Sequence, residues 1–115
     1  MPERVPTGWL GRRAEVMILT IFRSRLRPEN QAAYQQMAAR MHDLAQGMPG
    51  FRSIKTFTAE DGERVSIVEF ESEETHNAWR AHPEHMKAQR LGRELFYSEF
   101  KIQVCKVERA YGMSH

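Results

Sequence analysis

Residues 50–72, GFRSIKTFTAEDGERVSIVEFES, restrict the fold more than any other stretch, because they predict a β-hairpin. The first strand alternates along its length, and the Asp61-Gly62 pair supplies the turn that reverses the chain. The return strand alternates again, with Val68 and Phe70 on the same face. The rest of the chain must therefore pack against two adjacent antiparallel strands.

The sequence before this hairpin predicts a strand followed by a helix. Residues 14–26, AEVMILTIFRSRL, carry β-branched and apolar side chains on both faces, which is typical of a central strand. Pro28 stands at the expected first helical position, and apolar residues recur at helical spacing from Tyr34 to Ala45. Gly47 is expected to end this helix.

The sequence after the hairpin predicts a second helical segment and a last strand. Ser72 is the expected N-cap, and Pro83 restarts the helix, which runs to about Tyr97. Residues 99–111, EFKIQVCKVERAY, then alternate as a strand. The order is β-α-β-β-α-β, so we expect an α+β, ferredoxin-like fold with a four-stranded antiparallel sheet and both helices on one face.

The helices of such a fold leave the other face of the sheet uncovered. Along the first strand that face would expose Met17, Leu19 and Ile21 or their alternates, which are too apolar to meet water comfortably. We therefore expect a homodimer that forms through the sheet faces.

Composition limits the class of protein. A chain of 115 residues, 41% hydrophobic and 28% charged, fits one globular domain at residues 14–115 after a flexible arm at residues 1–13. The net charge of +2 comes from interleaved residues, so no nucleic-acid partner is expected. Cys105 is the single cysteine, so no intrachain disulfide can form. The N-terminus lacks a signal-peptide core and the run VMILTIF is too short to span a bilayer, so we expect a cytoplasmic protein without membrane contact.

Residues 78–97, AWRAHPEHMKAQRLGRELFY, contain most of the candidate site residues. A continuous helix from Pro83 would turn Leu91, Leu95 and Phe96 toward the sheet, whereas Arg93 and Tyr97 would point outward. Most of this stretch therefore reads as an ordinary amphipathic helix.

His85 is the polar residue that such a helix places at the border of its buried face, beside Gly92 and next to Gln89. A histidine there either takes part in acid–base chemistry in a cleft between helix and sheet, or binds a backbone carbonyl. His82, the residue before Pro83, is expected to cap the helix.

The histidines do not predict a metal site. His76, His82 and His85 are close in sequence, but Pro83 interrupts the helical register and no acidic or cysteine third ligand accompanies them. No glycine-rich phosphate loop occurs, so neither a nucleotide nor a flavin cofactor is expected. Trp79 is either a core anchor or a wall on which a flat aromatic ligand stacks.

Four segments resemble the antibiotic biosynthesis monooxygenase superfamily of small dimeric α+β barrel proteins. They are PGF at 49–51, FESEE at 70–74, the 78–97 stretch and IQVCKVERAY at 102–111. The similarity covers residues 14–111 and is strongest at Trp-x-x-His-Pro-Glu-His and Gly-Arg-x-x-Phe-Tyr. The resemblance implies a dimer whose strands pair into a barrel. For some relatives it also implies oxygenation of aromatic polyketides or quinols by O₂ without metal or flavin.

The functional residues of these relatives match the chain in part. Where the polyketide-oxidising branch has an Asn and a Trp on its third strand, this chain has Ser66 and Phe70. His76 replaces a Tyr of that branch in the following helix. Trp79 matches a helical Trp of the haem-degrading branch, but Gln89 stands where that branch has its haem-ligating His.

Two functional hypotheses remain open. The first is a cofactor-independent monooxygenase that oxidises a small aromatic or quinol-like substrate with O₂. The second is a non-catalytic dimeric protein that binds a small apolar or aromatic ligand, with a haem-degrading monooxygenase relative as a further alternative. The candidate catalytic residues are His85 and His76. The candidate substrate-binding residues are Trp79, Phe70, Gln89, Arg93 and Tyr97.

Overall fold

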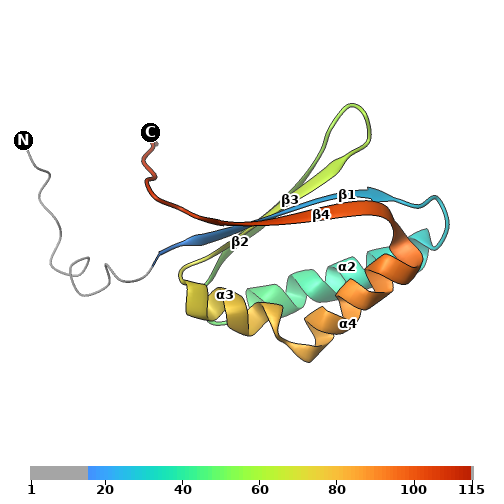
Figure 1. Ribbon diagram of the computed structural model, residues 1–115, viewed down its shortest axis with the longest axis horizontal. Helices are drawn as coiled ribbons and strands as arrows, with labels where there is room; N and C mark the ends of the chain where they lie inside the picture. The colour runs from blue at the N-terminus through green and yellow to red at the C-terminus, as the bar shows by residue number, and fades with distance from the viewer. Residues whose placement is uncertain (1–15, 115) are drawn as a thin grey trace, which may run out of the picture.

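The computed structural model describes residues 16–114, so the arm expected at residues 1–13 lies outside the described residues. The elements follow in the order β1 (Ile18–Leu26), α2 (Gln31–Gln46), β2 (Phe51–Thr58), β3 (Arg64–Phe70), α3 (Glu73–Arg80), α4 (Pro83–Leu91), η1 (Gly92–Phe96) and β4 (Tyr97–Lys106) (Figure 1). This order confirms the expected α+β ferredoxin-like fold.

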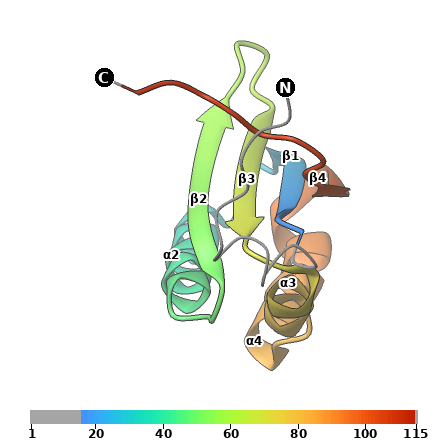
Figure 2. The same ribbon diagram turned by 90° about the vertical axis from the view of Figure 1, so that its left-hand side faces the viewer.

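The four strands form one open antiparallel sheet in the order β2-β3-β1-β4. β1 is central, as its apolar side chains on both faces predicted, and pairs with β3 on one side and β4 on the other. Figures 1 and 2 show α2, α3 and α4 on the same face of this sheet. None of the helices within residues 16–114 has the length and apolar character needed to cross a membrane.

α2 begins later than the sequence predicted. Pro28 lies in a bend and not at the first helical position, because Asn30 adopts a left-handed conformation (φ 63°) and the helix starts at Gln31. The Asn30 side-chain amide donates to the Leu95 carbonyl oxygen at 3.2 Å. The connection between β1 and α2 is thus tied to the end of the second helical segment.

The caps of α3 and α4 confirm the local predictions. Ser72 Oγ accepts from the backbone N–H of Thr75 at 3.1 Å. His82 Nδ1 accepts from the backbone N–H of Glu84 at 3.1 Å, and Pro83 is the first residue of α4. Proline can occupy this position because the first helical N–H groups have no partner within the helix.

The prediction of one continuous helix to Tyr97 was wrong. α4 ends at Leu91, and Gly92–Phe96 form a π-helical turn before β4 starts at Tyr97. A π-helix has more residues per turn than an α-helix, so it rotates the following side chains away from their α-helical directions. Leu95, expected in the core, is therefore 41% exposed, while Tyr97, expected to point outward, is half-buried.

The core lies between the sheet and the helices. Phe70 and Ala45 are fully buried and form a cluster with Val68 and Trp79. The Trp79 ring stacks on the Phe70 ring with their centroids 5.3 Å apart. Because Trp79 belongs to α3 and Phe70 to β3, this stack attaches the short helix to the sheet.

The uncovered face of the sheet exposes its apolar residues less than expected. Met17, Leu19 and Ile21 are half-buried, because neighbouring strands flank the central strand on both sides. The edge strands expose more, with Phe57 of β2 at 50% and Val104 of β4 at 55%. By strand register Val104 pairs with the buried Thr20, so it lies on the helix-facing side of β4, which the helices cover incompletely.

Gly50 allows α3 to approach the start of β2 closely. Its backbone has a φ of 80°, which favours glycine, and a Cβ added there would overlap the side chain of Thr75 in α3. The Gly50 carbonyl oxygen also accepts from the Glu71 N–H at 2.8 Å. The PGF segment thus sets the distance between the hairpin and the helix that follows it.

Candidate functional site

The structure separates the predicted site residues into two groups. Phe70, His76, Trp79 and His85 contact one another where α3 and the start of α4 meet the sheet. Tyr97 and Arg93 lie beyond the other end of α4, which is about 14 Å long for its nine residues, and Gln89 lies on α4 between the two groups. The seven predicted residues therefore do not converge on a single point.

His76 is held at both ring nitrogens. Its Nε2 lies 2.7 Å from Thr20 Oγ1 on β1, and its Nδ1 lies 3.3 Å from Asn77 Oδ1. Because the amide oxygen can only accept, Nδ1 carries the proton and Nε2 accepts from the threonine hydroxyl. Burial lowers the pKa of His76, with its side chain 3% exposed, so the ring stays neutral at neutral pH.

His85 packs against Trp79 with the ring centroids 4.1 Å apart. Its Nδ1–H donates to the Arg80 carbonyl oxygen at 3.3 Å, which leaves the Nε2 lone pair as the basic position. Burial lowers the pKa of His85, and the bond to the Arg80 carbonyl acts in the opposite direction. The buried Trp79 Nε1–H has no hydrogen-bond partner among residues 16–114. The structure thus shows the backbone bond of one alternative, and the acid–base role of His85 stays a prediction.

The other predicted residues have separate surroundings. Arg93 is exposed and its guanidinium lies over the Phe100 ring at 5.9 Å, while Gln89 is half-buried on α4. The Tyr97 ring lies 5.3 Å from Phe22 and 5.9 Å from Tyr34. Burial and the neighbouring Tyr34 raise the pKa of the Tyr97 phenol, so it remains protonated across the physiological range.

Within residues 16–114 the structure contains no group of three or more His, Cys, Asp or Glu side chains placed to hold a metal ion. His82 is engaged as the cap of α4, and Cys105 is a free, half-buried thiol on β4.

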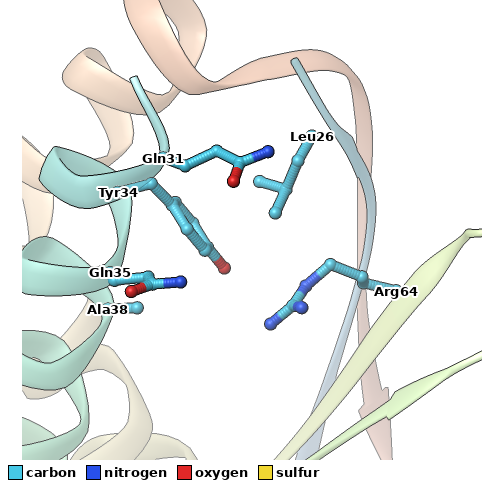
Figure 3. A pocket seen from close by; sticks show the side chains of 6 residues that line it. All are labelled: Leu26, Gln31, Tyr34, Gln35, Ala38 and Arg64. Carbon is cyan, nitrogen blue, oxygen red and sulfur yellow. The ribbon is translucent and has the colours of Figure 1, made fainter. Parts of the chain in front are cut away.

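A cavity of about 350 Å³ lies between α2 and the sheet, and the sequence analysis did not identify it. Its walls combine apolar groups, two amides, a phenol and a cation (Figure 3). The lining residues are Leu26, Gln31, Tyr34, Gln35, Ala38 and Arg64.

Two side chains face each other across this cavity. Figure 3 shows the Arg64 guanidinium extending from β3 toward α2 and the Tyr34 hydroxyl extending from α2 toward Arg64. The guanidinium carbon lies 5.7 Å from the centre of the Tyr34 ring, at the distance of a cation–π contact. Tyr34 also packs edge-on against Phe96 at 5.7 Å and against Tyr97. Tyr97 thus packs against Tyr34, one of the residues that line the cavity.

The hairpin alternation contained a signal for Arg64. Residues 64, 66, 68 and 70 share one face, and Val68 and Phe70 are buried beneath the helices. Extending the alternation from Val68 through Ser66 toward the turn places the cation of Arg64 on the same inward face. No local pattern predicts that Tyr34 lies opposite, because α2 is far from β3 along the chain.

The sequence model of the antibiotic biosynthesis monooxygenase family matches residues 17–91. The protein YqjZ of Bacillus subtilis (strain 168), which carries the name uncharacterized protein, is 31% identical over 101 residues, covering 88% of this chain and 89% of that protein.

Two solved structures share the fold. Rv0793 from Mycobacterium tuberculosis has a TM-score of 0.69 and 20% identity, covering 85% of this chain and 99% of that chain. SnoaB, a cofactor-independent oxygenase from Streptomyces nogalater, has a TM-score of 0.68 and 14% identity, covering 83% and 96%.

Proposed function

Since the chain belongs to the antibiotic biosynthesis monooxygenase family, we propose that it is a monooxygenase that oxidises a small hydroxylated aromatic or quinol-like molecule with O₂. The family match over residues 17–91 supports the reaction class. The fold shared with SnoaB, a cofactor-independent oxygenase, is compatible with a reaction that needs neither metal nor flavin.

The observation that carries this proposal is the cavity between α2 and the sheet. Its volume of about 350 Å³ is near the lower end of ligand pockets, which run from roughly 300 to 1,000 Å³. Such a space suits one ring or two fused rings. Leu26, Ala38 and the face of Tyr34 offer apolar contact, while Gln31 and Gln35 offer hydrogen bonds that orient a hydroxyl group.

The electrons for this reaction come from the substrate itself. A quinol loses a proton and the electron-rich anion reduces O₂. One oxygen atom then forms a bond to a ring carbon, and the other leaves as water with two hydrogens of the substrate. For naphthohydroquinone the products are hydroxynaphthoquinone and water. The protein's contribution is to orient the ring in a cavity that stays open to solvent on one side.

His85 is the proposed proton acceptor. Its Nδ1–H is fixed by the Arg80 carbonyl, and its lowered pKa keeps Nε2 unprotonated at neutral pH. Trp79 and Phe70 form the aromatic surface beside it, and His76 is held by Thr20. His85 and the cavity lie toward opposite ends of α4, which is about 14 Å long, so a ligand of one or two rings cannot contact both. We therefore propose the His85 cluster as an alternative position for the substrate, which the variants below distinguish from the cavity.

A second candidate function is non-catalytic binding of the same kind of ligand. It is favoured by one observation: none of the six side chains that line the cavity is a carboxylate or a histidine, the usual proton acceptors at neutral pH. A binding protein needs the apolar walls and hydrogen bonds of the cavity but no base.

Oxygen uptake with naphthohydroquinone separates these two functions. The expected result is protein-dependent uptake with one heavy-oxygen atom from labelled O₂ in the hydroxynaphthoquinone, as measured by mass spectrometry. Spontaneous oxidation instead gives naphthoquinone and hydrogen peroxide, so peroxide is measured in parallel. Uptake no faster than without protein would refute the monooxygenase function for this substrate class.

Two pairs of variants locate the reaction. Ala38→Leu places a larger side chain in the cavity, whereas Ala39→Leu changes an exposed neighbour on the same helix. We expect Ala38→Leu to lower the rate by about tenfold or more and Ala39→Leu to leave it unchanged. A rate loss in His85→Ala that is absent in His82→Ala would support the proposed proton acceptor, because both substitutions remove an imidazole at the start of α4.

We also propose that two copies associate through the uncovered sheet face. Ile21 and Ile67 pair across β1 and β3 on that face, and Leu19 lies beside them. An Ile21→Arg variant should sediment as a monomer where the original chain sediments as a dimer. Unchanged sedimentation of the variant as a dimer would contradict this interface.

A further inference from the structure

The guanidinium of Arg64 stands at the cavity without an acidic partner. No hydrogen bond or ion pair joins Arg64 to another side chain within residues 16–114, and its side chain is half-buried. Arg23 and Arg25 provide a contrast, because each is ion-paired, Arg23 with Glu63 at 2.9 Å and Arg25 with Asp61 at 2.8 Å. A guanidinium is charged throughout the physiological pH range, so placing it in a cavity favours an anion beside it.

The cavity contributes no negative charge of its own. None of its six lining side chains is acidic, and two of them, Gln31 and Gln35, carry amide N–H donors. The Tyr34 hydroxyl points toward Arg64 and supplies another donor (Figure 3). The guanidinium carbon lies 5.7 Å from the centre of the Tyr34 ring, and no side chain within residues 16–114 forms a hydrogen bond with the N–H edge of the guanidinium. That edge matches the two oxygens of a carboxylate, which a guanidinium binds through two parallel hydrogen bonds.

The cavity also offers apolar contacts to a ring. Leu26 contributes from the sheet and Ala38 from α2, and the Tyr34 ring packs against Phe96 and Tyr97. A site with one fork-shaped cation, amide donors and an aromatic wall recognises a molecule that is both flat and anionic. An aliphatic carboxylate would leave the ring wall unused, and a neutral aromatic would leave Arg64 unpaired.

We propose that this cavity binds aromatic carboxylates, with the carboxylate on Arg64 and the ring against Tyr34 and Leu26. The inference rests on the proposed function for its catalytic meaning, because the bound carboxylate would hold an adjacent ring hydroxyl in one orientation. The binding itself requires no oxygen chemistry. The substrate class is thereby narrowed from hydroxylated aromatics to hydroxylated aromatic acids.

Calorimetric titration without oxygen tests the proposal directly. The probe is hydroxynaphthoate with the carboxylate next to the hydroxyl, and the matched neutral probe is the corresponding amide. We expect the original chain to bind the acid about tenfold or more tightly than the amide, because hydrogen bonds to charged groups are the stronger ones. Equal affinities, or binding of neither probe, would overturn the proposal.

Three variants assign the preference to Arg64. Arg64→Gln should bind acid and amide equally, and Arg64→Lys should retain part of the preference as a point charge. Arg40→Gln removes an exposed cation from α2, where Arg40 is paired with Glu84 at 2.8 Å, and should keep the full preference. A preference for the acid that survives Arg64→Gln would refute the assignment. If Arg64→Gln does not fold, Ala38→Leu provides the test, because it should weaken the binding of both probes by obstructing the cavity.

The outcomes distinguish this inference from the proposed function. Arg64-dependent binding of the acid without protein-dependent oxygen uptake would support the site and refute the monooxygenase. Oxygen uptake with naphthohydroquinone that is unaffected by Arg64→Gln and not improved by a ring carboxylate would support the monooxygenase and refute the acid site.

Discussion

Replacing Thr20 by valine removes one buried hydrogen bond while preserving the shape of the side chain. Thr20 is 7% exposed, and its hydroxyl lies 2.7 Å from Nε2 of His76, which is 3% exposed. Valine leaves the imidazole lone pair without a partner where water does not reach, which costs about 1–3 kcal/mol. We therefore expect Thr20→Val to lower the free energy of unfolding by this amount.

The expected change in melting temperature follows from chain length. For a chain of 115 residues, a loss of about 1 kcal/mol in the free energy of unfolding lowers Tm by about 4 °C, because the entropy of unfolding scales with chain length. Thr20→Val should thus lower Tm by about 4–12 °C. Thermal unfolding followed by circular dichroism measures this shift, with all variants at the same protein concentration.

Thr56→Val is the matched control. Thr56 Oγ1 lies 2.7 Å from Ser66 Oγ, the same distance as in the buried pair, but Thr56 is exposed. Water can replace the lost partner, so the change in unfolding free energy should stay below about 1 kcal/mol. A Tm shift for Thr20→Val no larger than for Thr56→Val would refute the argument from burial.

Further predictions concern pH, backbone strain and haem. Because burial lowers the pKa of His76 below its unfolded value of about 6.5, the unfolded chain binds more protons, so the free energy of unfolding should fall as the pH decreases from about 7.5 through about 6.5. Denaturant titrations at several pH values should show a shallower dependence in His76→Gln. Gly50→Ala should destabilise the fold more than Gly62→Ala, since both glycines have a positive φ but only Gly50 lacks space for a Cβ; equal Tm shifts would contradict this. A haem titration should show no shift of the Soret band that would indicate axial ligation. Gln89 stands where the haem-degrading relatives have their ligating His, and an amide is not among the usual haem ligands.

The helix caps and the hairpin could be predicted because their causes are local. Ser72 and His82 accept hydrogen bonds from N–H groups two or three residues further along the chain, so sequence spacing alone specifies them. The Asp61-Gly62 turn likewise follows from the residues that form it, with Gly62 at a φ of 92°. The order of elements and the family resemblance then specify the sheet.

The second helical segment shows where local reasoning fails. The α-helical count was right for Phe96, which is buried, but wrong for Leu95 and Tyr97. The chain changes from an α-helix to a π-helical turn at Gly92, where an added Cβ would lie 2.6 Å from the Tyr97 ring. That close contact exists only once β4 has joined the sheet, so no helical periodicity within the segment contains it.

The candidate site also combines residues that are close along the chain with residues that only tertiary packing brings together. The sequence places Trp79, His76 and His85 close along the chain, on consecutive short helices joined at Pro83. The position of Arg64 opposite Tyr34 across a cavity depends on the tertiary structure, because the packing of α2 on the sheet brings the two side chains together. The sequence specifies which side chains are available. Whether a helix residue and a sheet residue face each other depends on how the helix packs on the sheet, which no local pattern encodes.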